Sequence, residues 1–523
     1  MIVDRLKLDF ASPTSQENGV LPATNTVINT ANRSAIVIGA GFGGLSAALR
    51  LTARGVHTTV VDRLAGPGGR AVEFVHAQSK HQFRYDAGPT VLTAPILFEE
   101  LFALFGEKLA DHVNLLPVTP WYQMRFADGT QFNYGGTTEQ IQTEIARFSA
   151  ADARAYPAYL AHSEKLFEKG YEELGTQAFL GWGSMLKALP AMMRLRADRS
   201  VYDVTAKFFK DDRIRRAFSI QPLLVGGNPF DTTSIYSLIH YLERKWGVWF
   251  VRGGMARLVD ALVALGTRHG VQFVWNADVR AIDVKEGLAN GVTLRDGTQL
   301  QANTVVCNAD PGYVLGQLLP PPYRKADITE RKQYSMGLFV WYFSTNKHYP
   351  DVPHHTILFG ETYREVLNKI FNTRQLPDDL SIYLHRPSAT DPACAPAGHD
   401  SFYALVPVPN LSADIDWASV AEPFKASLQV ALQERILPEL SQHIVDESHV
   451  TPQYFSQELM SPWGSGFSIT PTLMQSAGFR FPNRSPDIAN LYFTGAGTHP
   501  GAGVPGVVTS AKVVERLMFG TVA

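Results

Sequence analysis

The sequence predicts a mixed α/β and α+β fold, built from a parallel sheet and an interleaved second lobe with a sheet of its own. Three observations support this prediction. Residues 34–63 read as strand, glycine-rich turn, helix and strand. Residues 95–247 show mainly helical apolar spacing, and a second glycine-rich turn, GAGTHPGAGVPG, follows the strand-like run NLYFT near the C-terminus. The 523 residues exceed one compact core, so we expect more than one domain.

The composition excludes several classes of protein. The formal net charge is −2, from 47 basic and 49 acidic residues, so no overall field attracts nucleic acid. Only Cys307 and Cys394 are cysteines, without metal-ligand spacing, so we expect a reducing compartment and neither a disulfide framework nor a metal site. No apolar run reaches the roughly 18 residues of a membrane-spanning helix. The polar residues 1–33 lack the pattern of a secretory signal and are expected to form a loosely ordered extension.

The first glycine-rich turn has the pattern of a dinucleotide-binding site. The apolar run AIVIGA leads into G-x-G-x-x-G, LSAALRLTARG has helical spacing, and HTTVVD forms a second strand that ends at Asp62. Glycines at these positions permit close approach of a pyrophosphate to the helix start, and the terminal carboxylate can accept hydrogen bonds from a ribose. The combination predicts a Rossmann-like domain whose binding turn contains Gly39, Ala40, Gly41, Phe42, Gly43 and Gly44.

Two more glycine-rich turns follow within the first 95 residues. RLAGPGGRA contains Arg63, Gly69 and Arg70, and YDAGPTVLT contains Gly88, Pro89 and Thr90. The Arg70 guanidinium could offset pyrophosphate charge through charge-assisted hydrogen bonds, although a solvated arginine in an ordinary turn is the alternative. Three such turns suit a long cofactor that lies extended along the domain.

These segments resemble a known group of proteins. GAGFGGLSAALRL, VVDRLAGPGGRA and YDAGPTVLT are similar to the N-terminal FAD-binding region of the flavoprotein amine oxidase and carotenoid desaturase superfamily. The resemblance implies FAD as the cofactor, with Asp62 where glutamate is usual. It also implies that the unit beginning at WGVWFVRGG returns to the nucleotide domain, where the residue matching Val279 presents its backbone to the adenine.

Two segments in the middle of the chain have competing interpretations. FLGWGSMLKALPAMMRLRADR, residues 179–199, could lie in a membrane interface with Trp182, Leu186 and Met192 inward, or form a core helix. The aromatic residues Trp246, Trp249 and Phe250 would ordinarily belong to a core. A resemblance to bacterial-type phytoene desaturases, carried by SIYSLIHYLERKWGVWFVRGG, favours a role in lining the substrate site.

The C-terminal glycine-rich turn carries the most specific resemblance. The segment from GSGFSITPTLMQ to AKVVERLM follows the bacterial phytoene desaturase pattern almost continuously. The resemblance places this turn beside the isoalloxazine and the pyrophosphate. His499 is either a proton acceptor near flavin N5 or a turn residue, and His385 and Cys394 are expected to be loop residues without a catalytic role. The implied cofactor-binding residues here are Gly495, Gly497, Gly503, Val504 and Pro505.

The chemistry expected from the sequence is that of a flavin. No nucleophile elbow, paired-carboxylate motif or metal motif is visible, which fits a reaction carried by the cofactor. The resemblance implies an FAD-dependent enzyme that introduces double bonds into 15-cis-phytoene, giving neurosporene or lycopene, by hydride transfer from an allylic carbon to flavin N5. It implies quinone or oxygen as electron acceptor. Because the C40 substrate resides in a bilayer, we expect peripheral association with the cytoplasmic face of the membrane.

Other functions compatible with these motifs are desaturation of hydroxy- or methoxyneurosporene or of C30 diapophytoene. From another class comes a non-enzymatic prenyl-lipid carrier of the escort-protein type. The expected division of the chain is an extension at 1–33, a discontinuous FAD-binding domain at 34–94, 248–315 and 485–523, a helical, membrane-contacting and substrate region at 95–247, and a substrate-binding lobe with a sheet at 316–484.

Overall fold

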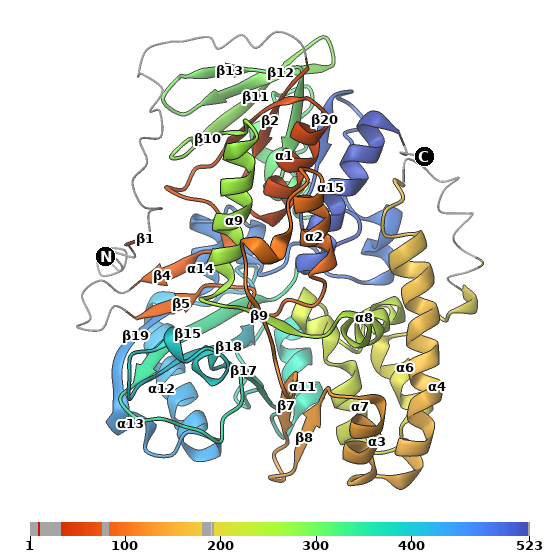
Figure 1. The fold of residues 1–523 in the computed structure, drawn as a ribbon, viewed down its shortest axis with the longest axis vertical. Helices are drawn as coiled ribbons and strands as arrows, with labels where there is room; N and C mark the ends of the chain where they lie inside the picture. The colour runs from red at the N-terminus through yellow and green to blue at the C-terminus, as the bar shows by residue number, and fades with distance from the viewer. Residues whose placement is uncertain (1–8, 11–32, 76–82, 180–189, 191–192, 521–523) are drawn as a thin grey trace.

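A computed structural model describes residues 9–10, 33–75, 83–179, 190 and 193–520 (Figure 1). Within this part of the chain, a parallel sheet occupies the upper half of the molecule and a larger mixed sheet the lower half, with helices along one side (Figure 1). The mixed α/β and α+β class predicted from the sequence is confirmed. The predicted membrane contacts Trp182 and Leu186 lie outside the described residues.

The five-stranded sheet is entirely parallel, in the order β10-β3-β2-β14-β20. Its strands come from three separated stretches of the chain: β2 (Ser34–Ile38), β3 (His57–Val61), β10 (Gln272–Val274), β14 (Thr304–Cys307) and β20 (Leu491–Phe493). Successive side chains of a strand point to opposite faces, and both faces of this sheet are covered. Val37 and Val60 pack against the helices, whereas Ile38 and Val61 pack on the other side.

The two faces have different covers. Helices α1 (Phe42–Ala53), α2 (Ile96–Ala103), α9 (Met255–Arg268) and α15 (Val504–Phe519) share one apolar cluster with the first face. The second face packs against the antiparallel sheet β11 (Val279–Lys285), β12 (Leu288–Leu294) and β13 (Gln299–Gln301). The helices and the antiparallel sheet cover the two faces of the parallel sheet. The carboxyl ends of its strands continue into the turns that follow them.

The seven-stranded sheet has the order β19-β15-β18-β17-β16-β7-β8. Its strands are β7 (Tyr122–Arg125), β8 (Gln131–Tyr134), β15 (Gly337–Thr345), β16 (His355–Leu358), β17 (Ile382–His385), β18 (Asp400–Val408) and β19 (Ile444–Val450). Every residue of β15 is buried because helix α12 (Trp417–Arg435) covers one face. Residues such as Leu338 and Tyr342 on the other face belong to the cluster around the cavity described below.

The hairpin β7–β8 lies within residues 95–247, which the sequence predicts to be mainly helical, and was not foreseen there. It joins the larger sheet through parallel pairing of β7 with β16. The burial of both strands alternates residue by residue, as expected for strands with one covered face. The alternation of buried and less buried side chains spans only four residues in each strand. The longer helical patterns on either side hide it in the sequence.

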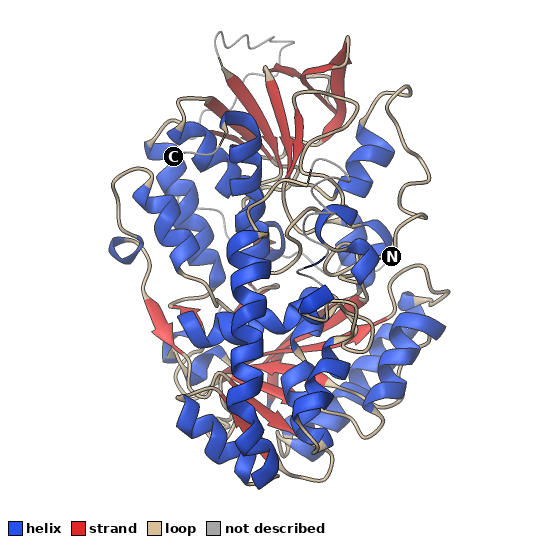
Figure 2. Ribbon diagram, turned by 90° about the vertical axis from the view of Figure 1, so that its right-hand side faces the viewer, coloured by secondary structure: helices blue, strands red, loops and turns tan. Residues whose placement is uncertain are grey.

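The helical side contains α3 (Thr138–Ala146), α4 (Ala150–Phe167), α6 (Val201–Phe208), α7 (Asp212–Ser219) and α8 (Leu238–Trp246). Helix α4 runs along the right of Figure 1, and Figure 2 turns this side toward the viewer. The remaining described strands are β1 (Asp9–Phe10), β4 (Glu73–Val75), β5 (Arg84–Asp86), β6 (Leu115–Pro117) and β9 (Trp249–Val251). The remaining described α-helices are α10 (Pro311–Tyr313), α11 (Tyr363–Asn368), α13 (Leu440–His443) and α14 (Pro452–Gln457).

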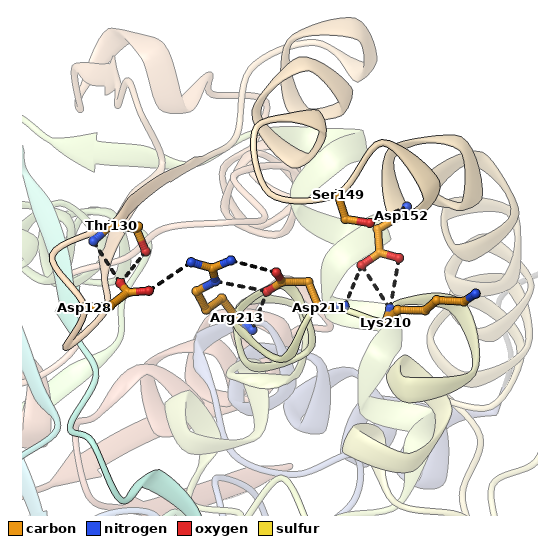
Figure 3. Close-up of polar contacts among 7 residues, drawn as sticks. All are labelled: Asp128, Thr130, Ser149, Asp152, Lys210, Asp211 and Arg213. Atoms are coloured by element: carbon orange, nitrogen blue, oxygen red, sulfur yellow. Dashed lines mark hydrogen bonds and ion pairs between the residues drawn. The ribbon is translucent and has the colours of Figure 1, made fainter.

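Polar contacts tie these helices to the sheet (Figure 3). The buried carboxylate of Asp152 in α4 accepts hydrogen bonds from the backbone N–H groups of Lys210, at 2.9 Å, and Asp211, at 2.8 Å. The Arg213 guanidinium pairs with Asp211 at 2.8 Å and with Asp128, in the β7–β8 turn, at 2.9 Å. Two otherwise unpaired N–H groups before α7 are thereby satisfied, and the hairpin is held against α7.

No helix among the described residues is both long and apolar enough to cross a membrane.

Candidate functional site

A cavity of about 530 Å³ lies between the carboxyl ends of the parallel strands and one face of the larger sheet. One part of its wall consists of the glycine-rich turns and the segment that follows β14. The other part is mostly apolar and comes from α8, the segment before it and the larger sheet. Side chains of this second part include Leu223, Leu224, Ile239, Leu242, Leu338, Ile357 and Leu405.

The first glycine turn is packed too closely for side chains. A Cβ on Gly44 would lie 1.9 Å from the Gly39 carbonyl oxygen, and a Cβ on Gly43 would lie 2.3 Å from Asn308 Oδ1. Gly39 has a φ of +96°, which glycine adopts readily. Helix α1 begins after Gly41, which offers no side-chain cap, so its first N–H groups can bind an anion. Gly39, Gly41 and Phe42 line the cavity, whereas Ala40, Gly43 and Gly44 lie behind it.

Asp62 lies at the end of β3, where the sequence predicts the ribose acceptor. Its Oδ2 accepts a hydrogen bond from the N–H of Ala40 at 2.7 Å, and Oδ1 accepts one from Leu64 at 2.9 Å. Burial raises the pKa of Asp62, while these two hydrogen bonds oppose the rise. A carboxylate offers about four acceptor positions, so two remain for ribose hydroxyls. The short side chain therefore also holds the glycine turn.

The second turn carries two arginines with different surroundings. Arg70 donates from Nε to the Gly466 carbonyl at 2.8 Å and from Nη2 to Ser461 Oγ at 3.1 Å. Burial lowers the pKa of Arg70, and Asp310 acts in the opposite direction. The partly exposed Arg63 donates to the backbone carbonyls of Gln457, the last residue of α14, and of Glu458. Both arginines and Gly69 line the cavity.

The third turn connects the cofactor end of the cavity with the larger sheet. A Cβ on Gly88 would lie 2.2 Å from the Arg70 carbonyl oxygen, so these two turns are in contact. The hydroxyls of Thr90 and Tyr383 are hydrogen-bonded at 2.6 Å. Gly88, Pro89, Thr90 and Tyr383 all line the cavity.

The C-terminal turn meets the first one. Gly495 donates its N–H to Ser510 Oγ at 2.8 Å, and a Cβ on Gly43 would lie 3.2 Å from that nitrogen. Gly503, with a φ of +91°, precedes α15 without a side-chain cap, so a second helix start faces the cavity. Further residues that line the cavity are Val279 at the start of β11, Gly495, Gly497, Val504 and Pro505.

Asn308 is a residue that the motifs do not reveal. It follows β14, donates from Nδ2 to the Gly39 carbonyl at 3.4 Å, and stands where a Cβ on Gly495 would come within 2.9 Å of its Oδ1. It therefore lies between the first and last glycine turns. A polar residue directly after a buried parallel strand is the signal that could have found it.

His499 lies in the cavity wall and is neutral. Its Nε2 donates to the Leu174 carbonyl at 2.9 Å, and the Phe179 ring packs against it edge-on with 4.8 Å between centroids. Burial lowers the pKa of His499 to about 4. Its contacts with the helical side match those of a positioned turn residue.

The aromatic residues expected to line the substrate site lie outside the cavity wall. Trp249 donates from its indole to the Trp246 carbonyl at 2.6 Å, and both rings pack against the helical face of the parallel sheet. Phe250 is buried beside His354, with 4.7 Å between ring centroids. Strand β9 pairs with β6, and this pairing directs its side chains into the core.

The mostly apolar part of the cavity wall also contains polar side chains that no sequence motif indicates. Glu243, Tyr122 and Tyr383 line the cavity, although each lies within a run that reads as ordinary helix or strand. Tyr383 is hydrogen-bonded to His355, one of three buried histidines with His354 and His385 whose ring nitrogens lie within 4.8 Å of one another. His385 therefore ends a buried strand and is not a loop residue.

Comparisons with known proteins show that the chain is an FAD-dependent oxidoreductase. Residues 42–514 match the family of flavin containing amine oxidoreductases. A solved structure of putrescine oxidase bound to putrescine shares the fold, with a TM-score of 0.61 at 14% identity, covering 94% of this chain and 99% of that chain. The uncapped starts of α1 and α15, the closely packed glycine-rich turns (the glycine cradle) and Asp62 fit FAD.

Curated relatives resolve the family further. The lycopene-forming phytoene desaturase of Paracoccus sp. is 46% identical over 94% of this chain and 98% of its own length. The neurosporene-forming phytoene desaturase of Rhodobacter capsulatus is 42% identical over 92% of this chain and 93% of its own length. The chain belongs to the phytoene desaturase family of flavin containing amine oxidoreductases.

Proposed function

We propose that the chain is a phytoene desaturase that introduces conjugated double bonds into 15-cis-phytoene, with neurosporene or lycopene as product. The observation that carries this proposal is one continuous cavity that joins the glycine-rich turns to a largely apolar chamber. The names of the relatives and their similarity over nearly the whole chain support the same substrate class.

The apolar chamber suits a hydrocarbon without polar groups. Affinity for such a substrate comes from burial, at about 0.8 kcal/mol per CH₂. FAD, when bound, supplies the two-electron acceptor for the hydride that leaves an allylic carbon. The chain's own residues bind the pyrophosphate and ribose, orient the hydrocarbon and exclude water from the reacting carbons. Quinone or oxygen is proposed as the final electron acceptor.

Association with the cytoplasmic face of the membrane is part of the proposal, because the substrate resides in a bilayer. Leu473 and Met474 are exposed side chains, at 36% and 65%, and lie close in sequence to Ser476 and Ala477 of the cavity wall. They are a second candidate contact besides residues 179–199. Co-sedimentation with liposomes tests both, using one variant with Trp182, Leu186 and Met192 made polar and another with Leu473 and Met474 made polar. Binding that neither variant weakens would contradict both candidate contacts.

The alternative substrates, hydroxy- or methoxyneurosporene and C30 diapophytoene, need the same cofactor site. They are separated from phytoene by supplying each to the purified enzyme and comparing rates. A prenyl-lipid carrier would need no flavin, so the glycine cradle argues against it. A purified protein with a flavin spectrum would exclude the carrier.

Expression in a bacterium that accumulates phytoene tests the function directly. We expect phytoene to be consumed and coloured carotenoids to appear in the chromatogram. Persistence of phytoene in cells whose purified protein contains FAD would show that the assigned substrate is wrong.

A further inference from the structure

The wall of the apolar chamber contains one deeply buried carboxyl group on helix α8, that of Glu243. Its side chain is almost fully shielded, with 1% of the residue exposed, and it lines the cavity. Oε1 accepts a hydrogen bond from the Tyr122 hydroxyl at 3.0 Å, and Oε2 accepts one from the Tyr134 hydroxyl at 3.0 Å. Helix and sheet therefore hold the carboxyl group in a fixed orientation beside the space for substrate.

A chain of exchangeable groups leads from this carboxyl group away from the cavity. The Tyr134 hydroxyl lies 2.5 Å from His240 Nδ1, and His240 Nε2 lies 3.1 Å from the Tyr156 hydroxyl. Burial lowers the pKa of His240 to about 3, so its ring is neutral and has one donor and one acceptor nitrogen. Each member can both donate and accept a hydrogen bond, so a proton on the carboxyl group can be shared along the chain as far as the buried Tyr156.

The same part of the wall contacts the cofactor turns. Tyr122 packs against His355, with 5.6 Å between ring centroids, and His355 Nδ1 lies 2.7 Å from the Tyr383 hydroxyl. Tyr383 is in turn hydrogen-bonded to Thr90 of the third glycine turn. Leu242, next to Glu243 on α8, belongs to the apolar cluster that includes Phe42 of the first turn. Side-chain contacts therefore connect the Glu243 site, through Tyr122, His355 and Tyr383, with the third glycine turn.

We propose that Glu243 is the catalytic residue that accepts the proton lost from the substrate in each desaturation step. The proposal rests on the proposed function. One C–H bond of the substrate breaks with its electron pair leaving as hydride, which reduces FAD. The adjacent C–H bond breaks, its electron pair forms the new C=C bond, and its proton forms an O–H bond on the Glu243 carboxylate. The proton is released from the Glu243 carboxyl group to solvent before the next step, and quinone or oxygen reoxidises the flavin.

The acid–base properties of the site favour this assignment over His499. Burial raises the pKa of Glu243 to about 7, and the hydrogen bonds from Tyr122 and Tyr134 and the positive charge of Arg244 limit the rise. A group with a pKa near the working pH can both accept and release a proton in each turnover. His499, whose pKa burial lowers to about 4, is the weaker base, although its Nε2 donates to a carbonyl and leaves Nδ1 as the acceptor nitrogen. The ionised form of Glu243 is the active one, so the rate rises as the pH rises through about 7.

The test is the anaerobic, single-turnover reduction of the bound flavin by phytoene in liposomes, measured against pH. We expect the wild type to show an acidic limb near pH 7. Glu243→Gln should react about 10²- to 10⁴-fold more slowly and lose the limb, because general acid–base groups contribute about that much. Tyr122→Phe should keep the limb but move it to higher pH, because the ionised carboxylate loses a donor.

Glu164→Gln is the matched control. Its Oε1 accepts the Tyr241 hydroxyl of the same helix α8 at 2.6 Å, but Glu164 lies outside the cavity wall. It should leave the rate and the pH profile unchanged.

Each outcome decides the proposal. An unchanged rate in Glu243→Gln, or a reduced rate that keeps the wild-type limb, would overturn it and leave Glu243 a structural residue. If Glu243→Gln did not retain FAD, the Tyr122→Phe profile would decide, and an unshifted limb would overturn the proposal. Failure of the wild type to reduce its flavin with phytoene would overturn the proposed function itself.

Discussion

Replacing Gly44 by alanine tests the claim that close packing of the first turn creates the cofactor site. The added Cβ would lie 1.9 Å from the Gly39 carbonyl oxygen, whereas nonbonded heavy atoms meet at roughly 3.5 Å. The turn and the start of α1 would have to separate by roughly 1.5 Å. Overpacking of this kind costs about 1–3 kcal/mol. We expect the Gly44→Ala variant without FAD to relieve the overlap by shifting the turn. FAD binding would then have to restore the strained arrangement of the turn.

The expected result is a loss of FAD affinity. Each 1.4 kcal/mol is a factor of ten in a dissociation constant, so we expect Kd to rise roughly 10- to 100-fold. The assay is titration of apo protein with FAD, followed by flavin fluorescence, with far-UV circular dichroism as a check on folding. Gly66→Ala is the matched control, since a Cβ there meets nothing within 4 Å and Gly66 lies outside the cavity wall. Equal affinities for both variants would refute the reasoning.

Three further predictions follow from buried groups. Asp62→Ala should weaken FAD binding about tenfold in the same titration, because a hydrogen bond to a charged group contributes about 1.5–3 kcal/mol; unchanged affinity would exclude Asp62 as a cofactor ligand. Asp152→Ala should lower the free energy of unfolding by about 1 kcal/mol in urea, because two part-buried N–H groups lose their acceptor, and a change near zero would show that water replaces the carboxylate. Burial raises the pKa of Cys307, so its thiol should react with a disulfide reagent only after unfolding; rapid reaction of the folded protein would contradict the packing.

Features that depend on local backbone chemistry could be predicted from the sequence. Gly39, Gly44 and Asp62 are recognisable because a tight turn and a terminal carboxylate need particular residue types at fixed spacing. The strands of the parallel sheet are recognisable because strands buried on both faces are continuous apolar runs. The mixed fold class followed from these signals and the FAD cofactor from the family resemblance, and both are confirmed. The division into domains and the individual site residues remain predictions.

Features that depend on which segments meet could not be predicted in this way. Trp249 was expected in the substrate site, but pairing of β9 with β6 directs it into the core. The hairpin β7–β8 was hidden among helical runs, because its place is set by pairing with β16, more than two hundred residues away. Whether an aromatic side chain faces a cavity or a core depends on its partners, and these are distant in sequence.

The sequence by itself determined a dinucleotide-binding site, since glycine spacing is a local requirement of a pyrophosphate beside a helix start, and its resemblance to the flavoprotein superfamily specified FAD. Only the tertiary structure decided which side chains form the chamber. Asn308 acquires its place between Gly39 and Gly495 because β14 lies between β2 and β20. Glu243 acquires its two tyrosine donors because α8 packs against the β7–β8 hairpin. A carboxyl group in a helical run is ordinary in sequence, and its pKa is raised only by the burial that folding imposes.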